Sequence, residues 1–306
     1  MLRNFLPNWF FGLCATLVLF VNTIVCGLVV FILGLVKLCL PINAVSHLLH
    51  IAYGTWCKGN RLGLMIGCED LNIDVPEQVR QQGWYLLVSN HISWLDIVVL
   101  SGVEALPAPK FFLKDELKYI PFIGTGAWAM GMPFMKRASK AQIAKNPKLK
   151  GLDVERTKRS CGNFRRHPTT VINFAEGTRF TPQKQRKQSS EYQHLLKPKA
   201  GGTAFALEVL NEQLDGLLNT TLVYQAQGQH ICRSFMLGQL QSIHVAIELY
   251  DMNSVPQGSY QLDKDYRIRF QNFLNAIWHT KDGQITQQML EHSKMDTQPS
   301  KETAPL

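Results

Sequence analysis

The sequence predicts an α/β fold in which helices flank a mixed β-sheet, preceded by an N-terminal membrane helix and a second, interfacial or re-entrant helix. Two observations lead to this prediction. Strand-length apolar runs alternate with helical patterns through most of the chain, as in α/β sheets. Before them, residues 9–36 contain no charged side chain. At 306 residues the chain is long enough for one large domain and an appended segment.

The N-terminal apolar run predicts a membrane helix. Residues Leu13–Leu35 are mostly Leu, Val, Ile and Phe, and at helical rise they are long enough to cross a hydrocarbon core. The run is too long for the apolar core of a cleaved signal peptide. Arg3 precedes it, whereas Lys37, Lys58 and Arg61 follow it. The positive-inside rule therefore places the rest of the chain on the cytoplasmic side of the membrane.

A second apolar stretch follows at Ile42–Trp56. It carries His47 and His50 and is interrupted by a glycine, so we expect an interfacial or re-entrant helix in place of a second full span. In the first helix, Asn22 and Thr23 either form helix-packing contacts or are single polar groups that the membrane tolerates.

Strand and helix patterns continue to about residue 290. Residues Leu71–Val75 alternate in polarity, and Trp84–Ser89 is a continuous apolar run of the kind that a buried parallel strand shows. We therefore divide the chain into membrane-anchoring helices over 1–57, one large domain over 58–290 and a polar C-terminal tail over 291–306. Further strands are expected at Phe111–Leu113, Pro133–Met135, Thr170–Phe174, Thr220–Tyr224 and Ile243–Leu249, and helices at Trp94–Val103, Leu152–Phe164, Thr203–Gln213 and Tyr266–Thr280.

Charge and cysteine content limit the classes of partner. The formal net charge is +9, and residues 110–199 hold 20 of the 32 basic residues but 6 of the 23 acidic ones, a local balance of +14. Such a stretch suits an anionic membrane surface, a phosphorylated substrate or nucleic acid equally well. The seven cysteines form no C-x-x-C pair and have no histidine at zinc-finger spacing. Neither a metal site nor a disulfide framework is predicted.

The candidate chemistry begins directly after the best buried-strand candidate. The segment Ser89–Asp96 reads S-N-H-I-S-W-L-D, and open α/β sheets place ligand-binding residues at such strand ends. A step of five residues on a helix turns about 500°, so a turn must separate His91 from Asp96, with Ser93 as the helix N-cap. Asp96 then accepts a hydrogen bond from one imidazole nitrogen and leaves the other as a general base. By itself, this spacing is also that of many solvated loop pairs.

Two further polar segments strengthen this reading. Residues Phe174–Arg179 read F-A-E-G-T-R, again after an apolar strand. Gly177 permits a tight turn or close substrate approach, and Arg179 is a forked donor suited to phosphate. Residues Gly131–Arg137 read G-M-P-F-M-K-R, a strand-like piece that ends in two cations. Each segment alone is equally typical of a polar surface turn.

Together, the three segments resemble the glycerolipid acyltransferase family typified by 1-acyl-sn-glycerol-3-phosphate acyltransferases. That family shares an N-H-x-x-x-x-D block, a block ending F-x-x-R and an F-x-E-G-T-R block, and order and spacing match over roughly residues 84–224. The resemblance implies that His91 is the general base and Asp96 its orienting partner. It implies that the acceptor site and its phosphate contacts are formed by Phe134, Arg137, Glu176, Gly177, Thr178 and Arg179. Lys199 lies where many relatives keep a cation before a helix, and it is either a further phosphate contact or a solvated lysine.

The implied function is a membrane-bound O-acyltransferase that needs no cofactor. It moves a fatty acyl group from acyl carrier protein or CoA thioester to the sn-2 hydroxyl of lysophosphatidic acid, at an anionic membrane surface. The absence of a G-x-S-x-G elbow favours direct transfer over a serine-linked intermediate. The chain resembles a longer bacterial subgroup of this family in its length, its N-terminal span and its M-P-F-M-K-R segment. This resemblance implies that the protein resides in the bacterial inner membrane. Two departures, Ala175 in place of a common Pro and a loose final block at Leu222–Tyr224, weaken the assignment of the acceptor.

Three alternatives stay open: another lysophospholipid as acceptor, a hydrolase that uses His91 and water, and a non-catalytic membrane-tethered binder of anionic lipid. A binder needs neither the His91 and Asp96 pair nor the block at 176–179. No recognisable nucleic-acid-binding module is present in the sequence, so nucleic acid is not an expected partner.

Overall fold

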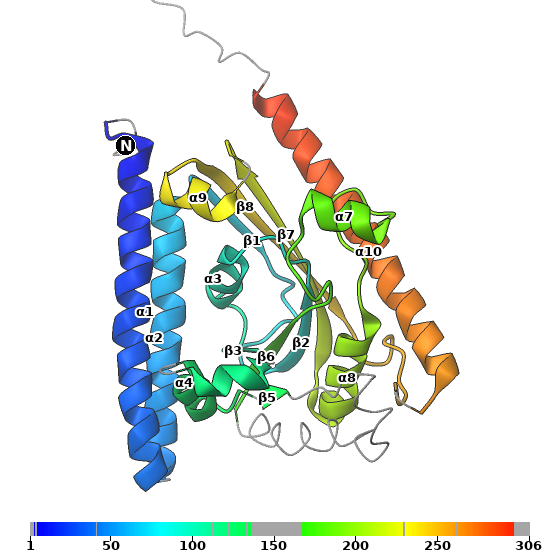
Figure 1. Cartoon of the computed structure of the whole chain (residues 1–306), viewed down its shortest axis with the longest axis horizontal. Coiled ribbons are helices and arrows are strands. Elements are labelled where there is room, and N and C mark those ends of the chain that lie inside the picture. The colour runs from blue at the N-terminus through cyan, green and yellow to red at the C-terminus, as the bar shows by residue number, and fades with distance from the viewer. Residues whose placement is uncertain are drawn as a thin grey trace, which may run out of the picture.

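Two long helices pack side by side along one flank of the protein (Figure 1). The computed structural model describes residues 3–296 apart from 4, 41, 112, 121–122, 133, 136–166, 229 and 261. Helix α1 (Asn8–Cys39) contains the whole predicted membrane run. Its apolar 18-residue window has a mean hydropathy of 2.7, and only 17% of that window is buried. Among the described helices it is the one long and apolar enough to cross a membrane.

Helix α2 (Asn43–Gly67) is longer than the predicted interfacial segment and runs through the expected domain boundary at 57/58. Polar contacts explain the extension. Asn22 of α1 donates to the carbonyl of Trp56 (2.9 Å) and to Oδ1 of Asn60 (3.1 Å), and Asn60 donates to Ser101 Oγ (2.8 Å). The indole of Trp56 also donates to Thr23. Asn22 and Thr23 are therefore helix-packing contacts, and the second half of α2 joins α1 to the domain.

The domain is built on a six-stranded sheet with the order β1-β8-β7-β2-β6-β3. Neighbouring strands are parallel except for the antiparallel pair β7 and β8, which confirms a mixed α/β sheet. Strand β2 lies in the middle and is buried on both faces, as its continuous apolar run predicted. The strands are β1 (Asp70–Asp74), β2 (Trp84–Ser89), β3 (Pro109–Phe111), β6 (Thr169–Phe174), β7 (Gly216–Ala226) and β8 (Leu240–Tyr250).

Several predicted boundaries differ from the observed ones. The expected strand 111–113 is divided, since Phe111 ends β3 and Leu113 begins β4 (Leu113–Lys114), which pairs with β5 (Phe134–Met135) in a separate two-stranded sheet. The expected helix 152–164 lies outside the described residues. The remaining helices are α3 (Leu95–Ser101), α4 (Ile123–Ala129), α7 (Pro182–Gln188), α8 (Ala200–Leu210), α9 (Ile231–Met236) and α10 (Lys264–Asp296), with short 3-10 turns at Asp115–Tyr119 and Asn211–Gln213.

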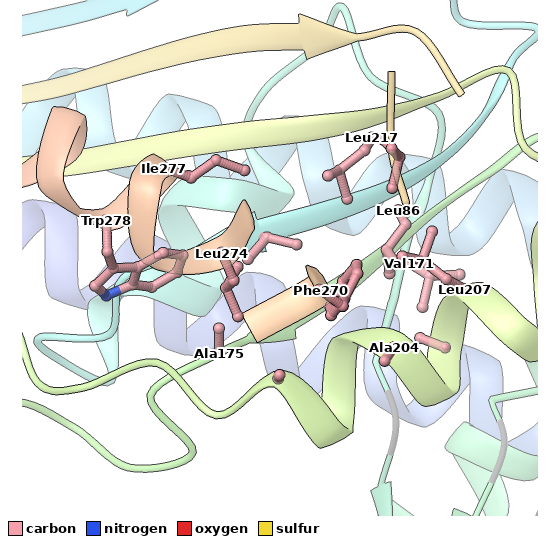
Figure 2. Packing of buried hydrophobic residues seen from close by; sticks show 14 of the residues in the cluster. Leu86, Val171, Ala175, Ala204, Leu207, Leu217, Phe270, Leu274, Ile277 and Trp278 are labelled. Atoms are coloured by element: carbon pink, nitrogen blue, oxygen red, sulfur yellow. The ribbon is translucent and has the colours of Figure 1, made fainter. Parts of the chain in front are cut away.

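Two apolar layers cover the two faces of the sheet, because successive strand residues point to opposite sides. Leu86 and Leu87 of β2 illustrate this: Leu86 belongs to the layer under α8 and α10, and Leu87 to the layer under α2 and α3. Figure 2 shows the first layer, where Phe270, Leu274 and Trp278 of α10 pack against strand residues and α8. Each such side chain stabilises the fold by about 1.5–3 kcal/mol through burial.

Helix α10 runs well beyond the predicted 266–280 segment and reaches Asp296, so the expected polar tail begins inside it. The register of β2 against β6 pairs Ser89 with Phe174. The chain therefore leaves both strands at the same edge of the sheet, and the polar residues that follow each strand lie in adjacent loops.

Candidate active site

The loop after β2 is held in place by its first residue. Asn90 is fully buried, and its side chain forms two hydrogen bonds with the backbone of Leu222 on β7. Its Nδ2 donates to the carbonyl oxygen, and its Oδ1 accepts from the amide, both at 2.9 Å. Because the amide side chain replaces a missing backbone partner, the position of the next residue, His91, is set by the central sheet.

His91 and Asp96 are in direct contact. The imidazole Nδ1 lies 2.7 Å from Oδ2 of Asp96, whose side chain is fully buried, while the His91 side chain is 15% exposed. The same Oδ2 accepts the amides of Ile92 (2.7 Å) and Ser93 (3.0 Å), and Oδ1 accepts the hydroxyl of Tyr224 (2.7 Å). Because Oδ2 accepts two backbone amides, it carries no proton and is an acceptor toward Nδ1 as well. His91 must then carry its proton on Nδ1, which leaves Nε2 with a free lone pair.

The turn between the two residues is as the spacing predicted, although the cap is different. Helix α3 starts at Leu95, and Trp94 at the cap position has no side-chain cap hydrogen bond. Ser93 lies one residue earlier, and its Oγ accepts the amide of Leu95 at 3.2 Å. Asp96, in the first turn, returns the contact by accepting the Ser93 amide. The catalytic candidate pair and the start of α3 thus stabilise the same loop.

One face of the His91 ring is covered by β6. The imidazole stacks on the ring of Phe174 with centroids 4.0 Å apart and an angle of 17° between the planes. Because Phe174 is the last residue of β6, this stacking joins the His91 loop to the F-A-E-G-T-R segment. The amide of Phe180 also donates to the carbonyl of His91 at 2.6 Å. The two predicted segments therefore form one structural unit.

The turn that follows β6 brings Lys199 to the site. Gly177 has a φ of +70°, a left-handed conformation that favours glycine, and its amide donates to the Phe174 carbonyl. A Cβ at Gly177 would lie 3.3 Å from Nζ of Lys199, and the Lys199 amide donates to Ala175 (2.8 Å). Lys199 is exposed and its side chain packs directly against the turn.

Arg179 is exposed, and its guanidinium lies over the ring of Trp94 at 4.7 Å from the centroid. A second cation supports it, since Nζ of Lys184 donates to Oγ1 of Thr178 (2.8 Å) and to the carbonyl of Arg179 (2.9 Å). Lys184 was not among the predicted site residues. In the sequence, only its position points to the site, because Lys184 lies in the first turn of α7, the short helix that follows the F-A-E-G-T-R segment.

Glu176 points into the interior. It has no exposed surface, and neither carboxyl oxygen has a hydrogen-bond partner among the described residues. Burial raises the pKa of Glu176 to about 8. The nearby backbone amides of Leu196 and His91 and the charge of Lys281 partly offset this increase, although neither amide reaches hydrogen-bond geometry. Glu176 is therefore buried beneath the turn and does not face the surface that Arg179 and Lys199 share.

Lys281 of α10 is also fully buried beneath the same strand ends. Its Nζ donates to the carbonyls of Thr220 (2.5 Å) and Val88 (3.5 Å), and it lies over the ring of Trp278. Burial lowers the pKa of Lys281 to about 7, against the attraction of Glu176 and Glu248. The sequence offered one signal for Lys281, its position three residues after Trp278 on the apolar stripe of α10. Lys281 was not predicted as a site residue.

Of the two remaining predicted acceptor-site residues, the structure describes one, Phe134. Phe134 lies on β5, in the two-stranded sheet and not in the sheet that carries His91. Arg137, with Lys136, lies outside the described residues. Tyr224 was missed as a site residue, although it belongs to the loosely matched final block. Within the described part of the chain, no group of three or more His, Cys, Asp or Glu side chains is arranged to hold a metal ion.

Comparison with known proteins places the matched region over this site. The family model described as Acyltransferase matches residues 70–225. The chain is 23% identical over 210 residues to 1-acyl-sn-glycerol-3-phosphate acyltransferase epsilon of Mus musculus, covering 61% of this chain and 55% of the relative. It is 31% identical over 123 residues to 1-acyl-sn-glycerol-3-phosphate acyltransferase of Saccharomyces cerevisiae, covering 40% of this chain and 36% of the relative.

Among solved structures, the chain is similar to the 1-acyl-sn-glycerophosphate (LPA) acyltransferase PlsC from Thermotoga maritima. The identity is 15% and the TM-score 0.45, with 85% of this chain and 97% of that chain covered. The chain spans about half the length of the curated relatives it matches.

Proposed function

Because the chain belongs to the Acyltransferase family, we propose that it is a membrane-bound O-acyltransferase that moves a fatty acyl group from a thioester donor to the sn-2 hydroxyl of lysophosphatidic acid. The observation that carries the proposal is the 2.7 Å contact between His91 Nδ1 and the buried Asp96, beside a turn that presents cations. The named substrate of the matched relatives supports this acceptor.

In the proposed step, Nε2 of His91 removes the proton of the acceptor hydroxyl while that oxygen attacks the thioester carbonyl carbon. The new C–O ester bond forms as the C–S bond breaks, and the leaving thiolate takes the proton back from the imidazolium. Asp96 stabilises the transient imidazolium, because its charge is 2.7 Å from Nδ1 in a buried position. Each electron pair and proton is accounted for without an acyl-enzyme intermediate.

The two hydroxyls nearest to His91 in sequence, those of Ser89 and Ser93, are unsuited to a covalent route. Ser89 Oγ donates to the carbonyl of Asn90 at 3.0 Å. Ser93 Oγ accepts the Leu95 amide and lies 3.1 Å from Sγ of Cys232, so it is engaged away from the His91 ring nitrogens. A nucleophilic serine would need a hydrogen bond to the base. This arrangement supports direct transfer.

The acceptor phosphate is assigned to the cations of the F-A-E-G-T-R turn. Arg179 offers a fork of donors that matches phosphate oxygens, and Lys199 packs against Gly177 on the same turn. We assign helix α1 to the membrane and the domain to the cytoplasmic side, because basic residues follow the helix and a lysolipid acceptor resides at the bilayer surface.

The test supplies membranes containing the protein with labelled acyl thioesters and a panel of lysophospholipids. We expect phosphatidic acid as the main product, and His91→Ala to abolish its formation while membrane association persists. The matched control is His279→Ala, since His279 is a largely exposed histidine on α10. Retained turnover in His91→Ala, or release of free fatty acid at the same rate without any acceptor, contradicts the proposal.

A further inference from the structure

Helix α10 packs beneath the active-site loops, although it lies outside residues 70–225, which the Acyltransferase family model matches. Its residues Leu274 and Trp278 belong to the apolar layer on one face of the sheet (Figure 2). The next turn of the helix carries two charged residues, Lys281 and Asp282. Each of them contacts a different part of the chain that leads into the active site.

Lys281 holds the end of strand β2 from the α10 side of the sheet. Its side chain has no exposed surface, and its Nζ donates to the carbonyls of Thr220 on β7 (2.5 Å) and Val88 on β2 (3.5 Å). In the register of these two strands the last pair is Ser89 with Thr220. The ammonium group therefore joins the strands where their pairing ends, and Val88 lies three residues before His91.

The buried ammonium group needs a functional explanation, because an apolar side chain at this position would bury as much surface without its cost. Removal of a charged group from water is unfavourable unless polar contacts compensate. The charge of Glu176 attracts Lys281, but neither carboxyl oxygen of Glu176 has a hydrogen-bond partner among the described residues. The contacts of Lys281 are the two strand carbonyls and the ring of Trp278. What the lysine adds over a leucine is therefore its hold on the ends of β2 and β7.

A second set of contacts from α10 holds the segment 193–198, which leads into Lys199. The carboxylate of Asp282 accepts from the first two backbone amides of this segment, at 2.7 Å and 2.8 Å. Nearer the start of the helix, Nε2 of Gln271 donates to the carbonyl of Pro198 at 3.2 Å. Both ends of the segment are thus attached to α10, and Lys199 follows it directly.

On the basis of the proposed function, we propose that Lys281 and Asp282 of α10 are positioning residues, Lys281 for the base His91 and Asp282 for the acceptor cation Lys199. Lys281 is fully buried, and the carboxylate of Asp282 is occupied by backbone amides. The two residues then act on different kinetic parameters. A misplaced base lowers kcat, because proton removal needs a closely defined geometry. A misplaced phosphate contact raises KM, because it weakens the binding of acceptor and transition state alike.

The test of Lys281 is the substitution Lys281→Met, which removes the ammonium group but keeps an unbranched side chain. We expect kcat to fall roughly 10- to 100-fold through a shifted His91, with the KM for lysophosphatidic acid unchanged. The thermal unfolding temperature should be unchanged or higher, because replacing a buried charge by an apolar group is often neutral or stabilising. A lysine that serves only the fold would show the reverse, a lower unfolding temperature with a normal kcat.

The test of Asp282 is the substitution Asp282→Ala. We expect the KM for lysophosphatidic acid to rise about tenfold, the effect of losing one hydrogen bond between charged groups, with kcat unchanged. The matched control on the same helix is Gln284→Met. Gln284 accepts from Thr221 (3.0 Å) and donates to Glu248 (2.6 Å), neither of which belongs to an active-site loop. The control should lower the unfolding temperature and leave kcat and KM unchanged.

The inference is overturned if Lys281→Met turns over at the normal rate, or if it changes the same parameter as Asp282→Ala. It is also overturned if Lys281→Met does not fold, since the ammonium group would then serve the fold. The same holds if Gln284→Met lowers kcat as much as Lys281→Met, because any loosening of α10 would then be enough. In each of these cases the unaltered protein still forms phosphatidic acid. No product from the unaltered protein refutes the proposed function itself, and this inference with it.

Discussion

The substitution Asp96→Asn separates the charge of Asp96 from its hydrogen bonds. An asparagine that places its carbonyl oxygen at the Oδ2 position still accepts from His91 Nδ1 and from the amides of Ile92 and Ser93. Its amide group then faces Tyr224, whose hydroxyl is able to accept as well as donate. Every buried partner keeps a contact, so we expect the folded protein to retain nearly all of its stability.

The rate should respond differently, because the negative charge beside the imidazole is lost. A hydrogen bond to a charged group contributes about 1.5–3 kcal/mol and one to a neutral group about 0.5–1.5 kcal/mol. The variant keeps a neutral bond and loses the difference, about 1–1.5 kcal/mol, which corresponds to a loss of roughly 5- to 13-fold in kcat if the charge acts on the imidazolium in the transition state. The KM for the acceptor should stay the same, since Asp96 is fully buried and does not contact substrate. The assay is acyl transfer at saturating donor and acceptor, with thermal unfolding measured in parallel.

The contrast with Asp96→Ala makes the reasoning refutable. Alanine leaves the amides of Ile92 and Ser93 and the Tyr224 hydroxyl without their acceptor, and each unsatisfied buried group costs about 1–3 kcal/mol. We expect this variant to unfold at a markedly lower temperature. If Asp96→Asn turns over at the normal rate, or if it melts as early as Asp96→Ala, the account of Asp96 as a charged orienting group is wrong.

Two further predictions concern the turn after β6. Burial raises the pKa of Glu176 above its unfolded value to about 8, so its contribution to stability is present in acid and is lost as pH rises through the folded pKa. Burial lowers the pKa of Lys281 to about 7, so Lys281 changes the pH dependence of stability only from about pH 7 upward. Unfolding measured between pH 5 and 7 should therefore show Glu176→Gln gaining stability relative to the unaltered protein as pH rises. Parallel stability curves for the two proteins would contradict this. Gly177→Ala should lower the free energy of unfolding by about 1–2 kcal/mol, because residue 177 has a φ of +70°. The added Cβ should also displace Lys199 and so raise the KM for lysophosphatidic acid. An unchanged KM would show that Lys199 does not contact the acceptor.

Much of the scaffold was predictable because its signals are local. Strand β2 was predicted at its exact residues and β6 to within one, since a strand buried on both faces reads as an uninterrupted apolar run. Helix α10 was predicted far too short, because its second half has few apolar residues to mark a buried stripe. Strands β7 and β8 were also underestimated, because a buried polar residue, Asn219 in β7 and Ser242 in β8, precedes the predicted start and interrupts the apolar pattern.

The sequence by itself determined the chemical pair, because His91 and Asp96 are five residues apart and a single turn is enough to join them. Only the tertiary structure decided what holds that pair: the Tyr224 hydroxyl on Asp96, the clamp of Asn90 on Leu222, and Lys281 beneath the strand ends. These contacts join residues that are 61 to 132 positions apart in the chain. Their partners are chosen by strand order and helix packing, which no local pattern of residues encodes.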